Sequence, residues 1–229
     1  MTGYVDIGNS DIKVAIDSPW KEIARFSTAS LSLEILNKSI TQPLTKLMVA
    51  SVVPTANDVI NVWAMAKKME IVFINHEQDI VTILTDSPAE VGADLIAAAA
   101  AVVGDCLVVD AGTATTISLI EDSSLRGVSI APGPKTQMNS LLSSTSLLQD
   151  AVLQPRTEYF GTSTPTALAS GIVQGQVAWI EHIALKHPYH TVIITGGFGG
   201  LLSASMNREH VYDPFVVFKG LQVIENGTA

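Results

Sequence analysis

Tyr4-Val-Asp-Ile-Gly-Asn-Ser-Asp-Ile-Lys-Val-Ala-Ile16 reads as two short apolar strands joined by a Gly-Asn-Ser turn, and the rest of the chain is organised around it. Gly8 removes the Cβ that would keep a phosphate away from the backbone, and Asn9 and Ser10 supply short hydrogen-bond donors. Asp6, at the mouth of the turn, is suited to hold a hydrated Mg²⁺. The pattern indicates a phosphate-binding loop, with an ordinary hairpin and a polar turn as the alternative.

A similar design returns in the second half of the chain as Leu107-Val-Val-Asp-Ala-Gly-Thr-Ala-Thr-Thr-Ile-Ser-Leu-Ile120. Asp6-x-Gly8-Asn9-Ser10 aligns with Asp110-x-Gly112-Thr113-Ala114. In each copy a buried strand ends in Asp-x-Gly and a second strand leads away, so the two copies could face one nucleotide from opposite sides. The repeat predicts two related lobes, residues 1–104 and 105–229, with chance repetition of a short pattern as the alternative.

The composition narrows the classes of function. The 229 residues suffice for two small α/β lobes, and the formal charge of −9 opposes binding to nucleic acid or to an anionic membrane. The single cysteine, Cys106, excludes an internal disulfide and a multi-cysteine zinc site, and it is better suited to the core than to nucleophilic chemistry. The longest apolar run, residues 95–103, is too short to span a bilayer, and the amino terminus lacks a signal-peptide profile. We expect a cytoplasmic protein.

Strand and helix patterns alternate along the chain, which is typical of an α/β fold with a largely parallel sheet. Residues 149–163 are expected to form an exposed loop or lid, and Thr164 lies where it would cap the helix that follows. Near the carboxyl end a β-branched strand runs into Thr195-Gly-Gly197, which suits a backbone lying flat against a ring such as adenine. Further strands are expected at 20–28, 46–53, 70–74 and 126–133, and helices at 31–40, 57–68, 95–103, 135–148 and 165–187.

Asp94 admits two interpretations. It precedes an Ala-rich helix, where aspartate most often acts as an N-cap. It also follows Gly92, whose missing side chain leaves room for a substrate, and a carboxylate there is placed to act as a general base. The Pro132-Gly133 pair is similarly open to two interpretations, a plain turn or a backbone loop that approaches a ligand.

Taken in order, these segments resemble the type III pantothenate kinases, which belong to the group that includes acetate and sugar kinases, Hsp70 and actin. The resemblance covers nearly the whole chain and implies an α/β protein with two ribonuclease-H-like lobes, the actin-like ATPase fold. The matching motifs are Asp6-x-Gly8-Asn9-Ser10, Ser51-Val-Val-Pro54, Glu90-Val-Gly-Ala-Asp94, Asp110-x-Gly112-Thr113-Ala114-Thr115-Thr116, Gly127 with Ile130-x-Pro132-Gly133, Thr164 with Ala167 and Gly171, and Thr195-Gly-Gly197.

The resemblance also implies a reaction and its residues. ATP would phosphorylate the 4′-hydroxyl of pantothenate, the first step of coenzyme A synthesis, in a homodimer whose sites lie at the subunit interface. Asp94 would be the base, Asp110 would bind K⁺ or NH₄⁺, and Asp6 would hold a hydrated Mg²⁺ indirectly. The residues implied at ATP are Asp6, Ile7, Gly8, Asn9, Ser10, Asp11, Ile12, Lys13 and Thr113, and those implied at pantothenate are Gly92, Ala93, Asp94, Leu95 and Thr164.

The chain departs from the family at Leu95, where the family has an arginine that is implied to contact pantothenate. Leucine supplies neither charge nor donor, so another cation is needed to compensate. Arg126, Lys135 and Arg156 are the candidates from sequence. Smaller departures are Ser118, where an aspartate is usual, Val128, where a second glycine is usual, and Gln149, where a proline is usual.

Three hypotheses therefore remain from the sequence. The chain is a pantothenate kinase with a modified acid-binding pocket, a kinase for another small hydroxy compound, or a catalytically weak homologue that binds nucleotide and has a regulatory role. The turnover of pantothenate separates the first hypothesis from the other two. ATP binding without turnover would favour the third.

Overall fold

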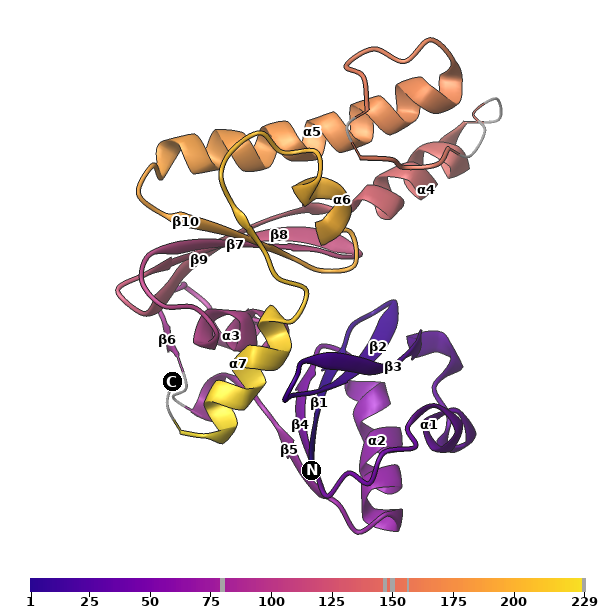
Figure 1. Cartoon of the computed structure of the whole chain (residues 1–229), viewed down its shortest axis with the longest axis vertical. Coiled ribbons are helices and arrows are strands. Elements are labelled where there is room, and N and C mark those ends of the chain that lie inside the picture. Colours follow the sequence, from indigo (N-terminus) through magenta and orange to yellow (C-terminus); the bar gives the residue numbers. More distant parts are fainter. Residues whose placement is uncertain (79–80, 146–147, 149–150, 156, 228–229) are drawn as a thin grey trace. The chain divides into compact units, whose positions relative to one another are not determined.

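The computed structural model describes residues 1–78, 81–145, 148, 151–155 and 157–227 (Figure 1). The chain forms two compact units. Unit 1 contains Met1–Val102 and Phe215–Ala229, and unit 2 contains Val103–Pro214. The expected division at residues 104 and 105 therefore differs from the observed one chiefly at the carboxyl end, where the chain returns to unit 1.

Unit 1 is built on a five-stranded sheet in the order β3-β2-β1-β4-β5. The strands β1, β2 and β3 are antiparallel, whereas β1, β4 and β5 are parallel. The sheet is therefore mixed, because the opening hairpin contributes antiparallel pairs that a largely parallel sheet would lack. The strands are β1 Thr2–Ile7, β2 Asp11–Ile16, β3 Lys21–Ser27, β4 Lys46–Ser51 and β5 Glu70–Phe73.

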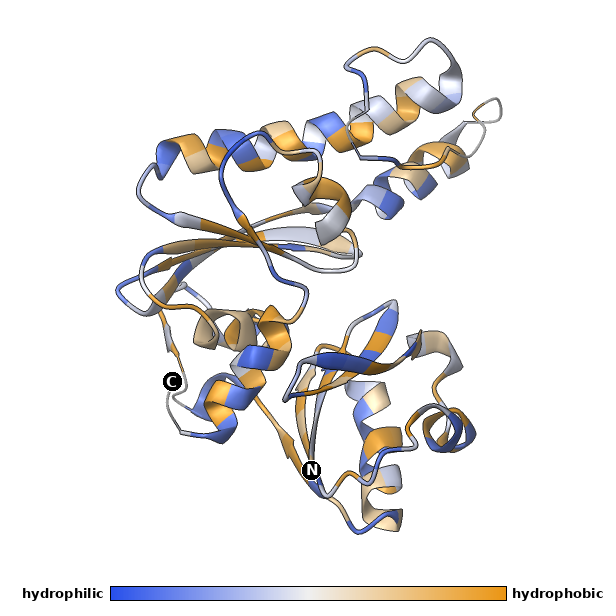
Figure 2. Ribbon diagram, in the orientation of Figure 1, coloured by the Kyte–Doolittle hydropathy of each residue, from blue (hydrophilic) through white to orange (hydrophobic). Residues whose placement is uncertain are grey.

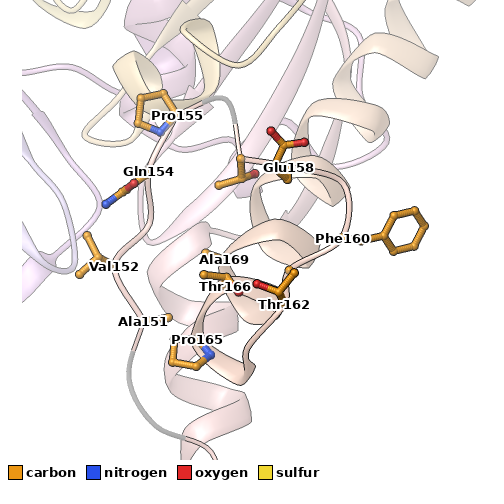
Figure 3. Close-up of a pocket in the computed structure, with 12 residues that line it drawn as sticks. Ala151, Val152, Gln154, Pro155, Glu158, Phe160, Thr162, Pro165, Thr166 and Ala169 are labelled. Atoms are coloured by element: carbon orange, nitrogen blue, oxygen red, sulfur yellow. The ribbon is translucent and has the colours of Figure 1, made fainter.

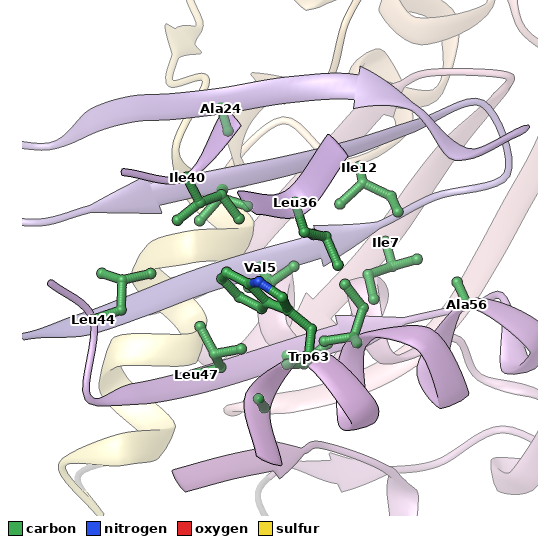
Figure 4. Close-up of a cluster of buried hydrophobic side chains, with 14 residues drawn as sticks. Val5, Ile7, Ile12, Ala24, Leu36, Ile40, Leu44, Leu47, Ala56 and Trp63 are labelled. Carbon is green, nitrogen blue, oxygen red and sulfur yellow. The ribbon is translucent and has the colours of Figure 1, made fainter. Parts of the chain in front are cut away.

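Alternating side chains of β1 enter two apolar cores, one on each face of this sheet. Val5 and Ile7 pack with α1 (Leu33–Ser39) and α2 (Pro54–Ala66) around Trp63 (Figure 4). Tyr4 packs on the other face with α3 (Ala93–Ala100) and α7 (Val216–Glu225). The period of two in a strand requires this alternation, and it places Asp6 on the same face as Tyr4. The short elements of this unit are the 3-10 helices Thr28–Ser30, His76–Gln78 and Pro88–Glu90 and the strand β6 Thr82–Ile83.

Helix α7 is held to unit 1 by close packing and by a carboxylate. Gly220 lies so near α3 that a Cβ there would collide with the carbonyl oxygen of Ala97. Glu225, the last residue of α7, accepts hydrogen bonds from Thr2 Oγ1 (2.9 Å) and Tyr4 Oη (2.8 Å). Helix α7 was not predicted, and its attachment to unit 1 is the physical reason why the expected boundary fails at the carboxyl end.

Gly220→Ala is expected to lower the free energy of unfolding by about 1–3 kcal/mol, because the added methyl group overpacks the contact between α7 and α3. Gly175→Ala is the matched control, since no atom lies within 4 Å of a Cβ built at that helical position. The control should be neutral or stabilising by up to about 1 kcal/mol through its helix propensity. Urea unfolding of both variants measures the difference, and equal stabilities would contradict the packing argument.

Unit 2 repeats the topology of unit 1. Its strands follow the order β11-β10-β7-β8-β9, with β7-β8-β9 antiparallel and β7-β10-β11 parallel, so β7 takes the central position that β1 has in unit 1. The internal repeat predicted from Asp-x-Gly is thus confirmed at the level of strand order. The strands are β7 Cys106–Ala111, β8 Ala114–Glu121, β9 Ser124–Pro132, β10 Thr191–Thr195 and β11 Val211–Tyr212.

The core of unit 2 lies between β7, β8 and β10 and the helices α5 (Thr164–Lys186) and α6 (Gly199–Ser203). Figure 2 shows hydrophobic residues along these central strands. The remaining helix is α4 (Pro134–Ser144), shorter than the expected 135–148. Ser163 caps α5, whereas Thr164 is its first helical residue, so the expected cap was off by one position. The Ser163 hydroxyl accepts from Thr166 N, and the Thr166 side chain accepts from Ser163 N, which forms a capping box.

Cys106 is buried at the start of β7, and burial raises the pKa of its thiol, with Asp105 raising it further. A thiol that ionises less readily is a poorer nucleophile, so the prediction of a core cysteine is confirmed. Among the described residues, no helix has the length and apolar character that crossing a membrane requires.

Candidate active site

One group of predicted site residues lies on the hairpin between β1 and β2 of unit 1. Asp6 stands opposite Lys13 in the antiparallel register, and Lys13 Nζ lies 2.9 Å from Asp6 Oδ2. Both side chains are largely buried, so this pair is shielded from solvent more than a surface ion pair is. The ammonium of Lys13 thus neutralises the carboxylate of Asp6, a pairing that the sequence analysis did not predict.

The turn of this hairpin is held by two hydrogen bonds to Gly8, and the residues at its tip are exposed. Gly8 N donates to Asp11 O (3.0 Å), and Thr28, just after β3, donates from its hydroxyl to Gly8 O (2.7 Å). Asn9 and Ser10 are exposed. A Cβ at Gly8 would meet only Asp11 O, at 3.4 Å, so packing within the protein does not demand glycine there. Glycine at this position leaves the backbone of the turn accessible to a ligand outside it.

Asp94 lies at the start of α3, on the face of the sheet that also carries Asp6. Gly92 is the N-cap and Asp94 is the second helical residue, so Asp94 does not occupy the cap position of the alternative interpretation. Its Oδ1 accepts a hydrogen bond from Leu95 N (2.9 Å). A Cβ on Gly92 would collide with this same Oδ1 and would lie 3.2 Å from Val52. Glycine at position 92 therefore leaves room for the Asp94 carboxylate.

Burial raises the pKa of the Asp94 carboxyl above the ordinary value of an aspartate, and the negative charge of Asp6 raises it further. Hydrogen bonds from backbone N–H groups and the positive charge of Lys13 act in the opposite direction. The structure thus brings Asp94 into electrostatic contact with the hairpin pair Asp6 and Lys13. A raised pKa suits a carboxylate that must accept a proton near neutral pH.

The end of β1, the residue after β4 and the residue before α3 lie close together beside Asp94. Val52, which follows β4, donates its N–H to Ile7 O (3.1 Å) at the end of β1, and its side chain approaches Gly92. No role was predicted for the Ser51-Val-Val-Pro54 motif. Val52 links the end of β4 to both the end of β1 and the start of α3.

Leu95 follows Asp94 and is half-buried. It belongs to none of the apolar cores among the described residues. Of the three cations considered as replacements for the family arginine, Arg126 already pairs with Asp122, with Nη2 2.9 Å from Oδ2. Lys135 lies in the first turn of α4, and Arg156 falls outside the described residues, as does the departure at Gln149.

A separate group of predicted site residues lies on the β7–β8 hairpin of unit 2. Asp110 stands opposite Thr116 of β8 and beside Thr195 of β10 in the register of the sheet. These three side chains share one face, because the core of unit 2 takes the alternate residues of each strand. Asp110 occupies the place of Asp6, and Thr116 stands opposite it in the register where Lys13 stands opposite Asp6.

Thr116 Oγ1 is buried and makes no hydrogen bond with any of the described residues. Buried hydroxyls in proteins normally have a partner. A carboxylate beside an unsatisfied hydroxyl is the donor set that a hard cation prefers, so the residues fit a monovalent ion at Asp110. The signal for Thr116 in the sequence was its position six residues after Asp110, in the second strand of the hairpin.

Glycines allow three segments of unit 2 to meet at this hairpin. A Cβ on Gly133 would collide with the carbonyl oxygen of Gly112, and one on Gly196, whose φ is +90°, would collide with Asp110 Oδ1. Thr113 is exposed, and its carbonyl oxygen accepts from Gly133 N (2.9 Å) and from Thr136 Oγ1 (2.6 Å). The backbone of Pro132-Gly133 therefore lies directly against the turn that follows Asp110.

Thr164 lies at the start of α5 and lines an open pocket of about 860 Å³ between α4 and α5. A second pocket, of about 580 Å³, lies on the other side of this helix start and is lined by Thr162, Pro165 and Thr166 among others (Figure 3). Gly92, Ala93, Asp94 and Leu95 belong to unit 1, whereas Thr164 belongs to unit 2.

The family model for type III pantothenate kinase matches residues 4–186 of this chain. A type III pantothenate kinase from Phocaeicola vulgatus is 30% identical over 236 residues, covering 98% of this chain and 97% of that protein. A type III pantothenate kinase from Dehalococcoides mccartyi is 30% identical over 247 residues, covering 96% of this chain and 95% of that protein.

Solved structures show the same fold. A Campylobacter jejuni protein assigned to the Baf family of transcriptional activators aligns with a TM-score of 0.68 and 24% identity, covering 99% of this chain and 100% of that one. The ethanolamine utilization protein EutJ from Carboxydothermus hydrogenoformans aligns with a TM-score of 0.54 and 14% identity, covering 96% and 88% of the two chains. The expected actin-like fold is thereby confirmed. The match of the family model to residues 4–186 and the two relatives of 30% identity establish that the chain belongs to the type III pantothenate kinase family.

Proposed function

We propose that this chain transfers the γ-phosphoryl group of ATP to the 4′-hydroxyl of pantothenate, the first step of coenzyme A synthesis. The observation that carries the proposal is the position of Asp94 at the start of α3, on the sheet face of Asp6, where Val52 links the end of β1 to Gly92. A base next to a phosphate loop is what phosphoryl transfer to an alcohol requires. The family to which the chain belongs supports the same reaction.

On the nucleotide side, the hairpin from Asp6 to Lys13 binds the ATP phosphates through the N–H groups and short side chains of its exposed tip. Lys13 adds positive charge, and Asp6 holds Mg²⁺ through water. Bound Mg²⁺ supplies charge neutralisation of the phosphates. Thr113, at the exposed tip of the second hairpin, is proposed as a further nucleotide contact.

On the acceptor side, Asp94 accepts the proton of the 4′-hydroxyl as the oxygen bonds to phosphorus. Oδ1 of Asp94 is held by Leu95 N. The carboxylate is thereby oriented, and Oδ2 is the atom we assign to proton transfer. Gly92, Ala93 and Leu95 form the adjoining substrate surface, and Thr164 is proposed as a further substrate contact.

Asp110 is proposed to bind K⁺ or NH₄⁺ together with the hydroxyl of Thr116. Asp110 has the place in its hairpin that Asp6 has in the first one, and the hydroxyl-bearing Thr116 stands opposite it in the register. A monovalent ion there adds positive charge for the triphosphate without taking part in proton transfer.

We also propose that the chain acts as a homodimer in the cytoplasm. Unit 2 exposes large apolar side chains near the start of α5, with Tyr159 72% and Phe160 90% exposed. Figure 3 shows Phe160 projecting outward from its loop. Exposed aromatic side chains in one region are typical of an interaction surface. Sedimentation equilibrium tests the dimer directly.

The function is tested by coupled ADP release from purified chain with saturating Mg-ATP, with and without pantothenate. We expect pantothenate-dependent release in K⁺ and lower activity when Na⁺ replaces K⁺, because Na⁺ is smaller and fits the same oxygen set less well. Equal rates in the two salts would contradict the assignment of Asp110. If ADP release did not depend on pantothenate while ATP still bound, the result would contradict the proposal of a pantothenate kinase. It would favour another hydroxy substrate or a regulatory homologue.

A further inference from the structure

Three side chains that could bind a metal ion meet at one end of the unit 2 sheet. Glu121 is the last residue of β8, His187 directly follows α5, and His190 directly precedes β10. Each offers one ligand atom, and these atoms all lie within 4.8 Å of one another. The cluster arises because β8 ends where β7 and β10 begin, with Ile120 beside Cys106 and Cys106 beside Thr191.

The spacing of the ligand atoms is close to that of a metal site. His190 Nε2 lies 3.0 Å from Glu121 Oε1, and the rings of His187 and His190 meet edge to face with centroids 4.9 Å apart. Tetrahedral Zn²⁺ with bonds of about 2.0–2.1 Å places neighbouring ligand atoms about 3.3 Å apart. Only small rotations of the side chains are therefore needed to bring all three ligands onto one ion.

One ring nitrogen of His190 is left without a hydrogen-bond partner among the described residues. Its side chain is only 10% exposed, and its Nδ1 is buried without a hydrogen bond to any of the described residues. A histidine kept only for packing or for its pair with Glu121 would be expected to have both ring nitrogens satisfied, since an unpaired buried polar atom is costly. Rotation of the ring so that Nδ1 is the atom that coordinates the ion would remove this cost.

The groups around the cluster orient its carboxylate. Glu121 directs Oε1 to His190, while its Oε2 lies 4.0 Å from Arg126 Nε. Arg126 is itself fixed by Asp122. The two histidines are set by a turn in which His187 N donates to Ala184 O and His190 N donates to His187 O, both at 3.2 Å. Fixed partners behind the ligands are a common feature of metal sites in proteins.

We infer that Glu121, His187 and His190 form a binding site for a borderline divalent transition metal of the Zn²⁺ class. Two imidazoles and one carboxylate supply three ligands, and water completes the coordination. The ion would link the end of β8, the end of α5 and the start of β10, and so stabilise unit 2. The site is separate from the residues assigned to phosphoryl transfer, all of which lie elsewhere, so the inference does not depend on the proposed function.

The test uses Co²⁺ as a spectroscopic probe of the full chain, without a polyhistidine tag and after treatment with a chelator. We expect one Co²⁺ per chain with the visible absorption of a low-coordinate ion, and displacement by Zn²⁺. His190→Asn and Glu121→Gln should each weaken binding at least tenfold. His182→Asn is the matched control, since His182 is an exposed residue of α5 outside the cluster, and it should bind as the wild type does.

Zn²⁺ should also raise the Tm of the wild type and of His182→Asn, but not of His190→Asn, because an ion that binds only the folded state stabilises it. The inference is overturned if the wild type binds Co²⁺ no more tightly than Glu121→Gln does. It is also overturned if His182→Asn loses binding to the same extent as His190→Asn, since the ion would then sit on surface histidines. ADP release is measured separately, so failure of the metal site leaves the kinase test unaffected.

Discussion

Replacing Asp94 by asparagine is expected to lower kcat for pantothenate by about 10²–10⁴-fold, which is the usual contribution of a general base. The amide loses the charge and the proton affinity that a base needs. It keeps an oxygen that accepts the hydrogen bond from Leu95 N, so the local structure and the ATP affinity should stay close to those of the wild type. Steady-state ADP release gives kcat, and calorimetric titration with ATP gives the affinity.

Asp58→Asn is the matched control for this change. Asp58 is an exposed aspartate on α2, so its replacement removes the same charge away from the hairpin. The control should leave kcat near the wild-type value. If Asp94→Asn turned over pantothenate as fast as this control, Asp94 would have no part in proton transfer.

The pH dependence follows from the raised pKa of Asp94. Activity should rise with pH through a value above the ordinary pKa of an aspartate, because the base must be ionised. The folded state also binds this proton more tightly than the unfolded state, so the free energy of unfolding falls as pH rises between the two pKa values. Asp94→Asn lacks this loss of unfolding free energy. At pH values above both pKa values, the Tm of the variant should therefore equal or exceed that of the wild type. A variant that is less stable there would contradict the burial argument.

Leu95→Arg is expected to lower the KM for pantothenate by roughly a hundredfold. A charge-assisted hydrogen bond contributes about 1.5–3 kcal/mol, and each 1.4 kcal/mol is tenfold in affinity. Leu95 directly follows the proposed base and contributes to none of the apolar cores of the described residues, so the guanidinium can replace it without opening a cavity. The carboxylate of pantothenate would be its partner.

Leu95→Met provides the control, since it keeps an apolar side chain of similar volume. Its KM should match that of the wild type, and both proteins should show similar stability. If Leu95→Arg left KM unchanged while the wild type turned over pantothenate, the acid would be bound by another cation. If neither protein turned over pantothenate, a different hydroxy substrate would become the better explanation.

Local patterns were enough to predict much of this protein. The repeated Asp-x-Gly turn predicted two hairpins, because the conformational freedom of glycine acts over a few residues, whereas the helix expected at 57–68 begins at Pro54. The same repeat predicted two related lobes, and the shared strand order is consistent with them. The residues left the role of Asp94 open between N-cap and base, and the family resemblance supplied the roles expected of Asp94 and Asp110.

Other features depended on packing between distant segments. The sequence contained no signal that α7 would pack against α3, since the contact rests on Gly220 meeting the backbone of Ala97. The sharing of one sheet face by Asp6, Lys13 and Asp94 follows from strand register and from where α3 docks. Likewise, Glu121 and His190 are 69 positions apart and meet only because β8 and β10 flank β7. Turn chemistry is short-ranged and can be predicted from neighbouring residues, whereas the partner of a charged side chain is set by which buried surfaces fit together.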